Sequence, residues 1–345
     1  MKVCNCMNKL EKVSVAIYAD IASGRIPPGG KLPTFDELER IHNVSYITIN
    51  ACIKRLKNAG LVTSRERFGV FVTERPPILR RFAVIFPKKD LSKNRFLQTL
   101  LNILNEESVK RNLEFRVFPD FEPHVDNSDY QELLSELNRM RIGGIALVSM
   151  PNPPADFELM HFPGIPVINL SSCMNVDEKA YVDKSCDYLL SRKKRRIAVL
   201  FKGKARIMGK YIDKRNSSEM ESPDHWFIPI GSDAMDGAAV ITRLLLDFSK
   251  EKRPNGLIIT DDNLVDHALG GVFLSRVKVP EELEIVTHCN WPNPVTSVIP
   301  VREFGYDIRI TVSIMIDTLL KSRGKSGLQN TEPVQVLPFF EEELQ

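Results

Sequence analysis

Several features that define common protein classes are missing from this sequence of 345 residues. No uninterrupted apolar run approaches the roughly 20 residues that a membrane-spanning helix needs, which argues against an integral membrane protein. The first residues, MKVCNCMNKLEKV, lack the apolar core of an export signal, so we expect a cytoplasmic location. Cys4 and Cys6 are spaced more tightly than zinc ligands usually are, and we expect neither a metal site nor a disulfide.

Signatures of catalysis are also missing. The sequence contains no glycine-rich phosphate loop, no nucleophile elbow and no cluster of metal ligands. His288 and Cys289 are adjacent, but neighbouring residues of a strand point to opposite faces, so they would make a poor catalytic pair. We therefore expect no enzyme, no cofactor and no metal. Cys52, Cys173 and Cys186 are expected to be small apolar residues of the core.

Charge is present but unevenly distributed, although the net charge is only +3. Residues 1–81 contain fourteen Lys and Arg against seven Asp and Glu, whereas the remainder contains 33 basic and 37 acidic residues. The basic N-terminal part fits a module that binds the phosphates of a nucleic acid, and the mildly acidic body fits a module without that function. The length of the chain suits two or three domains.

Residues 32–72 have the pattern of a helix, a turn, a second helix and a β-ribbon. Thr34 and Glu37 have the spacing of a capping box, which predicts a first helix that extends to about residue 41. A helix over residues 9–23 precedes it. The apolar positions of the first helix after the cap are Phe35, Leu38 and Ile41.

The second helix is predicted to begin at Ser45 as its N-cap and to end near Asn58 and Gly60. Two short strands, 61–63 and 70–72, would then enclose the basic loop 64–69. This arrangement is a winged helix-turn-helix, whose usual function is DNA binding. The buried face of the second helix is expected to consist of Val44, Ile49, Cys52, Ile53 and Leu56.

The order and spacing of these residues resemble the DNA-binding domain of GntR-type bacterial repressors over about residues 10–75. This sequence has Asp36, Tyr46 and Asn50 where that family often has arginine. We therefore expect an altered operator and a weaker dependence of affinity on salt. The residues that carry the resemblance are Ile21, Gly24, Pro28, Gly29, Leu32, Pro33, Thr34, Leu38, Val44, Ser45, Thr48, Leu56, Gly60, Leu61, Gly69, Phe71 and Val72.

The helix starts and the basic loop supply candidate DNA contacts. Asn50 is suited to an adenine in the major groove. Thr34 and Ser45 could instead serve only as caps, and Lys54 could simply be solvated. Gly69 is expected at the wing tip, where a larger residue would strain the turn. The predicted DNA-binding residues are Thr34, Ser45, Tyr46, Thr48, Asn50, Lys54, Arg65, Arg67 and Gly69.

Beyond a stiff, extended linker at residues 76–81, predicted from Pro76 and Pro77, strands and helices alternate. This series predicts an α/β fold with one or two doubly wound parallel sheets. The basic run 193–196 is expected to follow a helix C-terminus, where it complements the helix dipole. The predicted strands are 81–87, 113–119, 144–150, 165–171, 196–201, 256–260 and 283–288, and the predicted helices are 94–110, 131–141, 181–192, 235–249 and 263–276.

The body resembles the sugar-responsive, periplasmic-binding-protein-like domain of LacI/GalR repressors over about residues 81–340. A GntR-type head on such a body is similar to the AraR group of transcriptional repressors. The resemblance implies a winged-helix DNA-binding domain at 1–75, a linker at 76–81 and a LacI/GalR-like effector-binding domain at 82–345. Lobe one would comprise about 82–194 and 297–322, and lobe two about 195–296 and 323–345. The segments that carry the resemblance are 188–201, 206–209, 253–262, 279–283 and 295–305.

In such a body the effector lies between the lobes at the carboxyl ends of the strands. Arg206 matches the family arginine that grips ligand hydroxyls or carboxylates. Asp262 is the better helix cap, which would leave Asp261 for the ligand. Trp291 could stack on a sugar or pack on its own lobe. The predicted effector-binding residues are Asp90, Asn94, Phe96, Ser149, Arg206, Asp261, Asn290 and Trp291.

Two positions differ from a sugar-binding pattern. Ala180 and Cys289-Asn290 stand where the LacI/GalR family has aspartates, and sugar pockets commonly use carboxylates to accept hydroxyl protons. The ligand could therefore differ from a plain sugar, or other residues could bind it.

The sequence is best interpreted as that of a bacterial transcriptional regulator that binds double-stranded operator DNA as a homodimer. We expect a repressor of sugar or carbohydrate metabolism genes, controlled by a small molecule between the two lobes. A transport solute-binding protein or an α/β enzyme with an accessory DNA-binding head are the alternatives. The lack of an export signal and the basic head argue against the first, and the lack of catalytic motifs argues against the second.

Overall fold

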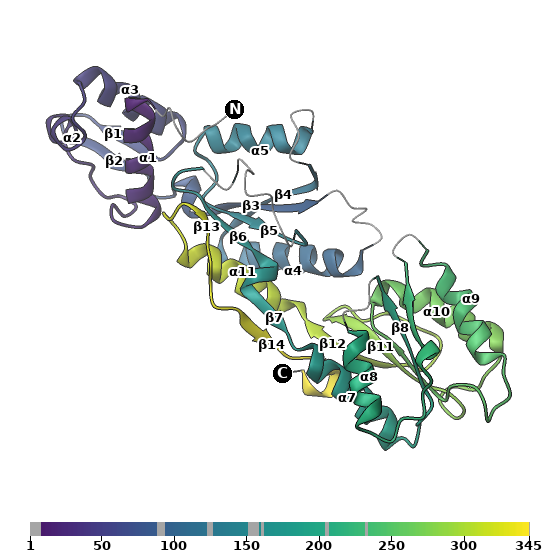
Figure 1. Cartoon of the computed structure of the whole chain (residues 1–345). Coiled ribbons are helices and arrows are strands. Elements are labelled where there is room, and N and C mark those ends of the chain that lie inside the picture. The colour runs from purple at the N-terminus through teal and green to yellow at the C-terminus, as the bar shows by residue number, and fades with distance from the viewer. Residues whose placement is uncertain are drawn as a thin grey trace. The chain divides into compact units, whose positions relative to one another are not determined.

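The computed structural model describes residues 8–87, 94–122, 127–150, 159, 162–203, 207–231 and 234–344 (Figure 1). Four residues discussed above, Cys4, Cys6, Asp90 and Arg206, lie outside these ranges. The chain forms two compact units: unit 1 comprises 1–89, 104–175 and 312–334, and unit 2 comprises 90–103, 176–311 and 335–345. Among the described helices, none is long and apolar enough to cross a membrane.

The N-terminal residues form the predicted winged helix-turn-helix. Its elements are α1 (Lys9–Ala22), α2 (Phe35–His42), α3 (Tyr46–Asn58), β1 (Val62–Arg65) and β2 (Gly69–Val72). Asn43 turns the chain between α2 and α3 in the left-handed conformation, with a φ of 52°, which asparagine tolerates better than most residues. Four residues of the predicted inner face of α3, Ile49, Cys52, Ile53 and Leu56, are buried, whereas Val44 precedes the helix and is half-buried against the core. Of the apolar positions of α2, Leu38 is 3% exposed, whereas Ile41 near the end of the helix is 65% exposed.

Unit 1 also contains a five-stranded sheet in the order β13-β6-β5-β3-β4. Its pairs are parallel, and residues 82–86 of β3 are completely buried because apolar layers cover both faces. The strands are β3 (Arg81–Pro87), β4 (Glu114–Phe121), β5 (Ile145–Leu147), β6 (Pro166–Asn169) and β13 (Gly327–Leu328). The helices of this part of the chain are α4 (Arg95–Arg111), α5 (Ser128–Asn138), α6 (Leu170–Cys173) and α11 (Ile308–Lys321), of which α4 and α11 run into both units.

Unit 2 is built on a six-stranded sheet in the order β15-β12-β11-β10-β8-β9. All its pairs are parallel except that of β12 with β15. The strands are β8 (Ile197–Lys202), β9 (Phe227–Ile230), β10 (Gly256–Ile259), β11 (Glu284–Trp291), β12 (Arg302–Asp307) and β15 (Phe339–Phe340). The helices are α7 (Glu178–Ser191), α8 (Met208–Asn216), α9 (Gly237–Leu246) and α10 (Asp262–Ser275). The short strands β7 (Met174–Val176) and β14 (Val334–Val336) pair separately, and 3-10 turns within the described ranges lie at Pro77–Leu79, Asp224–Trp226 and Glu341–Glu343.

These two parallel sheets confirm the predicted α/β fold class. The compact units differ from the predicted lobe limits in several segments: residues 90–103, 176–194 and 297–311 belong to unit 2, and residues 323–334 belong to unit 1. The largest of these segments contains α7. The reason for α7 is packing, since Tyr181, Val182 and Cys186 of α7 share one apolar cluster with Val199 of β8 and Phe304 of β12.

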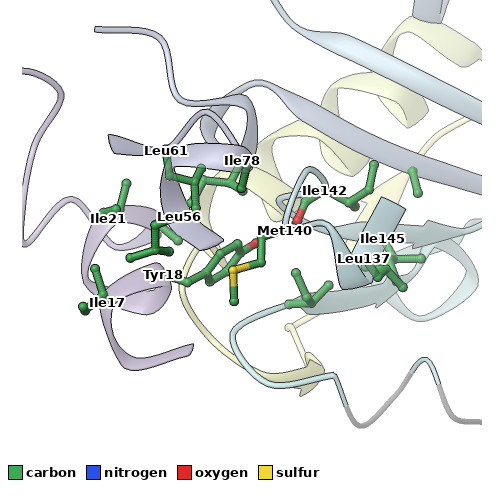
Figure 2. Close-up of a cluster of buried hydrophobic side chains, with 14 of the residues drawn as sticks. Ile17, Tyr18, Ile21, Leu56, Leu61, Ile78, Leu137, Met140, Ile142 and Ile145 are labelled. Atoms are coloured by element: carbon green, nitrogen blue, oxygen red, sulfur yellow. The ribbon is translucent and has the colours of Figure 1, made fainter. Parts of the chain in front are cut away.

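The winged helix and the five-stranded part of unit 1 share one continuous core (Figure 2). Tyr18 of α1 is 2% exposed, and its hydroxyl donates to the backbone carbonyl of Ile142 at 2.7 Å. Arg55 of α3 donates to the carbonyl of Asn138 at 3.2 Å. The junction therefore consists of buried side chains and hydrogen bonds from two helices of the head to the rest of unit 1.

The predicted stiff linker is extended only at its start. Pro76 has an extended backbone with φ −63° and ψ 131°, but Pro77–Leu79 close a 3-10 turn. Ile78 in this turn is fully buried, and Arg323 donates to the carbonyl of Leu79. Because the linker packs against unit 1, it does not act as a free spacer.

Candidate nucleic-acid interface

The start of α2 is closed by the predicted capping box. The backbone N–H of Thr34 donates to the Glu37 carboxylate at 2.7 Å, and the Glu37 N–H donates to the Thr34 hydroxyl at 3.3 Å. The hydrogen bond from the Thr34 backbone lowers the pKa of Glu37 below its ordinary value. Thr34 is exposed, so it can also meet a phosphate, but its hydroxyl already has a structural role.

The start of α3 lies where it was predicted, but its capping contact differs. Ser45 occupies the N-cap position, but its side chain makes no capping hydrogen bond. Its hydroxyl instead lies 3.2 Å from that of Thr48 one turn later. Both hydroxyls therefore form a polar pair at the helix start, where backbone N–H groups and the helix dipole favour an anion such as a DNA phosphate.

The exposed face of α3 carries the polar residues predicted to contact DNA. Tyr46, Asn50 and Lys54 follow one another at intervals of four residues and are all exposed. Residues with this spacing lie on one face of a helix. The ring of Tyr46 packs on Phe35 of α2, with 5.3 Å between the ring centroids, which orients the hydroxyl relative to the helix pair.

The wing presents cations around a tight turn. Arg65 and Arg67 are both exposed, and the guanidinium of Arg65 lies over the ring of Phe71, 4.6 Å from its centroid. Lys31 approaches the same hairpin, because it forms an isolated antiparallel bridge with Phe71. Gly69 does not lie at the wing tip as predicted. It begins β2 opposite Arg65, and residues 66–68 form the tip. Its φ of 111° still favours glycine.

Two exposed apolar residues were missed by the sequence interpretation. Ile47 in the first turn of α3 is 78% exposed, and Phe68 at the wing tip is 70% exposed. Apolar residues are ordinarily assigned to a core, so their type gave no signal. The helical spacing of Ile47 from the buried Ile49 could have shown that it points outward.

On the carboxyl edge of the unit 2 sheet, Asp261 corrects a prediction. Asp261, not Asp262, caps α10: its carboxylate accepts from the backbone N–H of Asn263 at 2.9 Å. The ammonium of Lys202 at the end of β8 lies 4.0 Å from the same carboxylate. Lys202 and Asn263 thus join the predicted Asp261 in one polar group, and neither was foreseen.

Asn290 and Trp291, also predicted to bind effector, have structural partners in unit 2. The Asn290 amide donates to the Asp262 carboxylate at 2.6 Å, and both residues are buried. Burial raises the pKa of Asp262 above its ordinary value. Trp291 is 3% exposed and its indole N–H donates to the carbonyl of Phe339 at 3.2 Å, so it packs on its own unit.

The remaining described effector candidates lie on different segments. Asn94 caps α4 by accepting from the N–H of Leu97 at 3.1 Å, and Phe96 is half-buried in the first turn of that helix. Ser149 follows β5 with a φ of 58°. Ala180 has no carboxylate to offer a ligand. Its backbone N–H donates to the Asp177 carboxylate at 2.8 Å. Within the described ranges, no group of three or more His, Cys, Asp or Glu residues could hold a metal ion.

Comparison with known proteins places these features in context. Residues 9–72 match the model of the gntR family of bacterial regulatory proteins. The chain is 23% identical to the arabinose metabolism transcriptional repressor of Halalkalibacterium halodurans, with 93% of each chain covered. An HTH-type transcriptional regulator of Mycobacterium tuberculosis is 28% identical over 67 residues, which is 19% of this chain and 55% of that protein.

Solved structures share the fold of the body. A LacI family transcriptional regulator from Lactobacillus casei with bound glucose matches with a TM-score of 0.55 and 14% identity, covering 76% of this chain and 98% of that one. A regulatory protein of the LacI family from Chloroflexus aggregans matches with a TM-score of 0.58 and 18% identity, covering 75% and 96%. At these identities the likeness establishes the fold.

Proposed function

We propose that this chain, which joins a helix-turn-helix domain of the gntR family to a body with the LacI-family fold, is a transcriptional repressor controlled by a small molecule. Residues 1–75 would bind operator DNA and residues 82–345 would bind the effector, with 76–81 between them. The observation that carries the proposal is that the polar face of α3 is exposed beside a cationic wing. Most apolar residues of the head are buried.

The chemistry of this surface suits duplex DNA. The exposed hydroxyls and amides of α3 match base edges in the major groove, and the arginines of the wing match phosphates. Ile47 supplies an apolar contact of the kind that fits a thymine methyl group. The excess of Lys and Arg over Asp and Glu in residues 1–81 favours the same partner.

DNA binding itself is tested by selection from a random pool of duplexes with the full-length chain, followed by affinity measurements at several salt concentrations. We expect a shared sequence among the selected duplexes and a linear fall of log affinity with log salt concentration. A transport protein or an enzyme with no DNA function would select no sequence.

Asn50 is predicted to read a base. The Asn50→Ala variant should lose about 5- to 150-fold discrimination against replacement of one adenine, because a bidentate amide contact to adenine provides roughly 1–3 kcal/mol. The measurement is a set of affinities for single-base variants of the selected duplex. Asn58→Ala is the matched control, since Asn58 is an exposed asparagine at the other end of the same helix. Unchanged discrimination in Asn50→Ala would show that Asn50 reads no base.

The effector is proposed to be a sugar or a sugar derivative. Lys202, Asp261 and Asn263 gather donors and acceptors at the carboxyl edge of the unit 2 sheet, where ligands of open α/β sheets bind. The repressor of Halalkalibacterium halodurans is named for arabinose metabolism, which favours a carbohydrate. A thermal-shift screen of sugars, sugar acids and sugar phosphates tests this, because a ligand that binds the folded state raises the melting temperature.

A homodimer is proposed from the surface of α9 and α10, which pack side by side in unit 2 (Figure 1). A groove of about 680 Å³ lies at the end of α10, lined by Arg243 of α9, by residues 272–274, 276, 277 and 279, and by residues 298–300. Large exposed apolar side chains border or continue it, and apolar patches of this kind mark interfaces. A second copy of the chain is the expected occupant, since a symmetric operator requires two heads. The exposed residues are Val240, Leu244, Phe248, Phe273, Leu274 and Val298.

Leu244→Asp is predicted to break this dimer. A buried carboxylate at the interface should raise the dimer dissociation constant by about 30-fold or more, as expected for loss of roughly 2 kcal/mol at a central contact. Light scattering across a concentration series measures the mass, and operator affinity should fall in parallel. Leu337→Asp is the control, because Leu337 is 48% exposed in unit 2 but lies outside α9 and α10. A Leu244→Asp protein that remains dimeric would contradict the assignment.

A further inference from the structure

The tip of the wing carries an aromatic ring that the fold of the head does not use. Phe68 is 70% exposed, whereas its neighbours Val70 and Val72 on β2 are 7% and 1% exposed. The ring therefore buries little apolar surface in the core, and its exposure to water is unfavourable. The exposed ring is available to a partner outside the head.

The backbone of the turn holds Phe68 at the tip. The N–H of Phe68 donates to the carbonyl of Arg65 at 3.0 Å, which closes the turn. Arg67 has a φ of 64°, a left-handed conformation that disfavours side chains other than those of glycine and asparagine. A cation is thus kept beside Phe68 at a position where glycine would be less strained, which points to a binding role for the pair.

The charges around the ring favour a polyanion. Arg65 and Arg67 flank Phe68 along the chain and are exposed. Lys31 lies beside the base of the turn, because a β-carbon built at Gly69 would be 3.1 Å from the Lys31 Cε. An apolar ring between cations matches a DNA groove, in which stacked bases lie between two rows of phosphates.

The chemistry of the ring limits how it can act on DNA. A phenyl group has no hydrogen-bonding atom, so it cannot read the N3 and O2 acceptors of the minor groove. Apolar side chains that enter the minor groove partly unstack a base step and kink the duplex by about 20–90°. The cost depends on the step and is lowest at flexible pyrimidine–purine steps such as TA and CA.

We propose that Phe68 is a wedge that enters the minor groove of the operator at a pyrimidine–purine step, partly unstacks that step and bends the DNA. The inference rests on the proposed DNA-binding function and deepens it. Phe68 thereby selects the operator by its deformability, while α3 selects it by base edges. This indirect recognition also fits a head that has Asp36, Tyr46 and Asn50 rather than arginines at DNA-facing positions.

The test compares full-length Phe68→Ala and Phe68→Leu with the wild type on a duplex selected from a random pool by the wild-type chain. Energy transfer between dyes at the duplex ends measures bending, and 2-aminopurine at the step measures unstacking. We expect Phe68→Ala to bind about tenfold or more weakly, from the usual contribution of aromatic stacking on a base, and to leave the duplex straight. Phe68→Leu should keep part of the bend, since leucine also acts as a wedge.

A second arm changes the DNA instead of the protein. Replacing the flexible step of the duplex by AA should weaken binding of the wild type but not of Phe68→Ala. Val109→Ala is the control, because Val109 is 83% exposed on α4 outside the head and should bind and bend as the wild type does.

The outcomes separate this inference from the proposed function. If Phe68→Ala bends the selected duplex as the wild type does, the wedge is wrong although DNA binding stands. If the wild type selects no duplex at all, both proposals fail. Circular dichroism of the variants confirms folding, which an exposed residue should not disturb.

Discussion

Replacing Tyr18 by alanine is expected to separate the unfolding of the head from that of the rest of unit 1. The ring is buried in the shared core shown in Figure 2, and truncation of a buried aromatic side chain costs about 3–5 kcal/mol. The loss also leaves the carbonyl of Ile142 without the hydroxyl that donates to it at 2.7 Å. Calorimetry should therefore show an added transition at lower temperature, assigned to the head.

A milder variant isolates the hydrogen bond. Tyr18→Phe keeps the ring and should lower the free energy of unfolding by about 1–3 kcal/mol, the cost of an unpaired buried polar group. Burial raises the pKa of the Tyr18 phenol well above its ordinary value, so the hydroxyl remains a donor throughout the neutral range. Phe68→Ala is the control, since Phe68 is 70% exposed. If Tyr18→Ala still unfolds in the same transition as the wild type, Tyr18 is not what couples the two parts.

Gly143→Ala should damage the same junction more severely. A β-carbon on Gly143 would lie 1.8 Å from the carbonyl oxygen and 2.7 Å from the carbonyl carbon of Ile78. Both are backbone atoms, so relief requires that the turn at 77–79 moves away from the sheet. Gly143 is also held by its own N–H, which donates to the carbonyl of Arg81 at 2.8 Å. We expect a loss of at least about 3 kcal/mol in the free energy of unfolding, at the upper end for overpacking.

Urea denaturation and soluble yield measure this effect. Gly209→Ala is the matched control, because a β-carbon there has no neighbour within 4 Å and the residue lies in α8. Alanine in a helix should stabilise that protein by roughly 0.5–1 kcal/mol. A Gly143→Ala protein as stable as the wild type would mean that the segment at 77–79 moves freely and the head is only tethered.

The fold was largely predictable because its elements have strong local signals. The predicted strand at 81–87 has the bounds of β3 (Arg81–Pro87), because the fully buried residues 82–86 form the continuous apolar run that a strand covered on both faces needs. The cap at Thr34 was predictable for a similar reason: the capping box is defined by two residues three positions apart.

Residues whose roles depend on distant neighbours were assigned less well. Asp261 and Asp262 are adjacent and chemically identical, and they differ because Asp262 is directed to Asn290 on the neighbouring strand β11. The sequence left two roles open for Trp291, stacking on a ligand or packing on its own unit. Its indole N–H donates to the carbonyl of Phe339, 48 residues away, so the side chain is held within unit 2.

The wing illustrates the same division. Sequence alone identified a basic hairpin, because strand residues and turn residues have different local preferences. It did not show that Gly69 lies at the base of the turn, nor that Phe68 occupies the tip, since both depend on the register of β1 with β2.

The sequence by itself determined the two-part organisation, the helix-turn-helix head and the α/β class, because periodicity, capping and turn chemistry are local properties of the chain. Only the tertiary structure decided how the head is attached. Tyr18 meets Ile142 across 124 residues of sequence, and Gly143 admits the backbone of Ile78 because it has no side chain. Such contacts arise when separately formed elements pack together, and no local pattern encodes them.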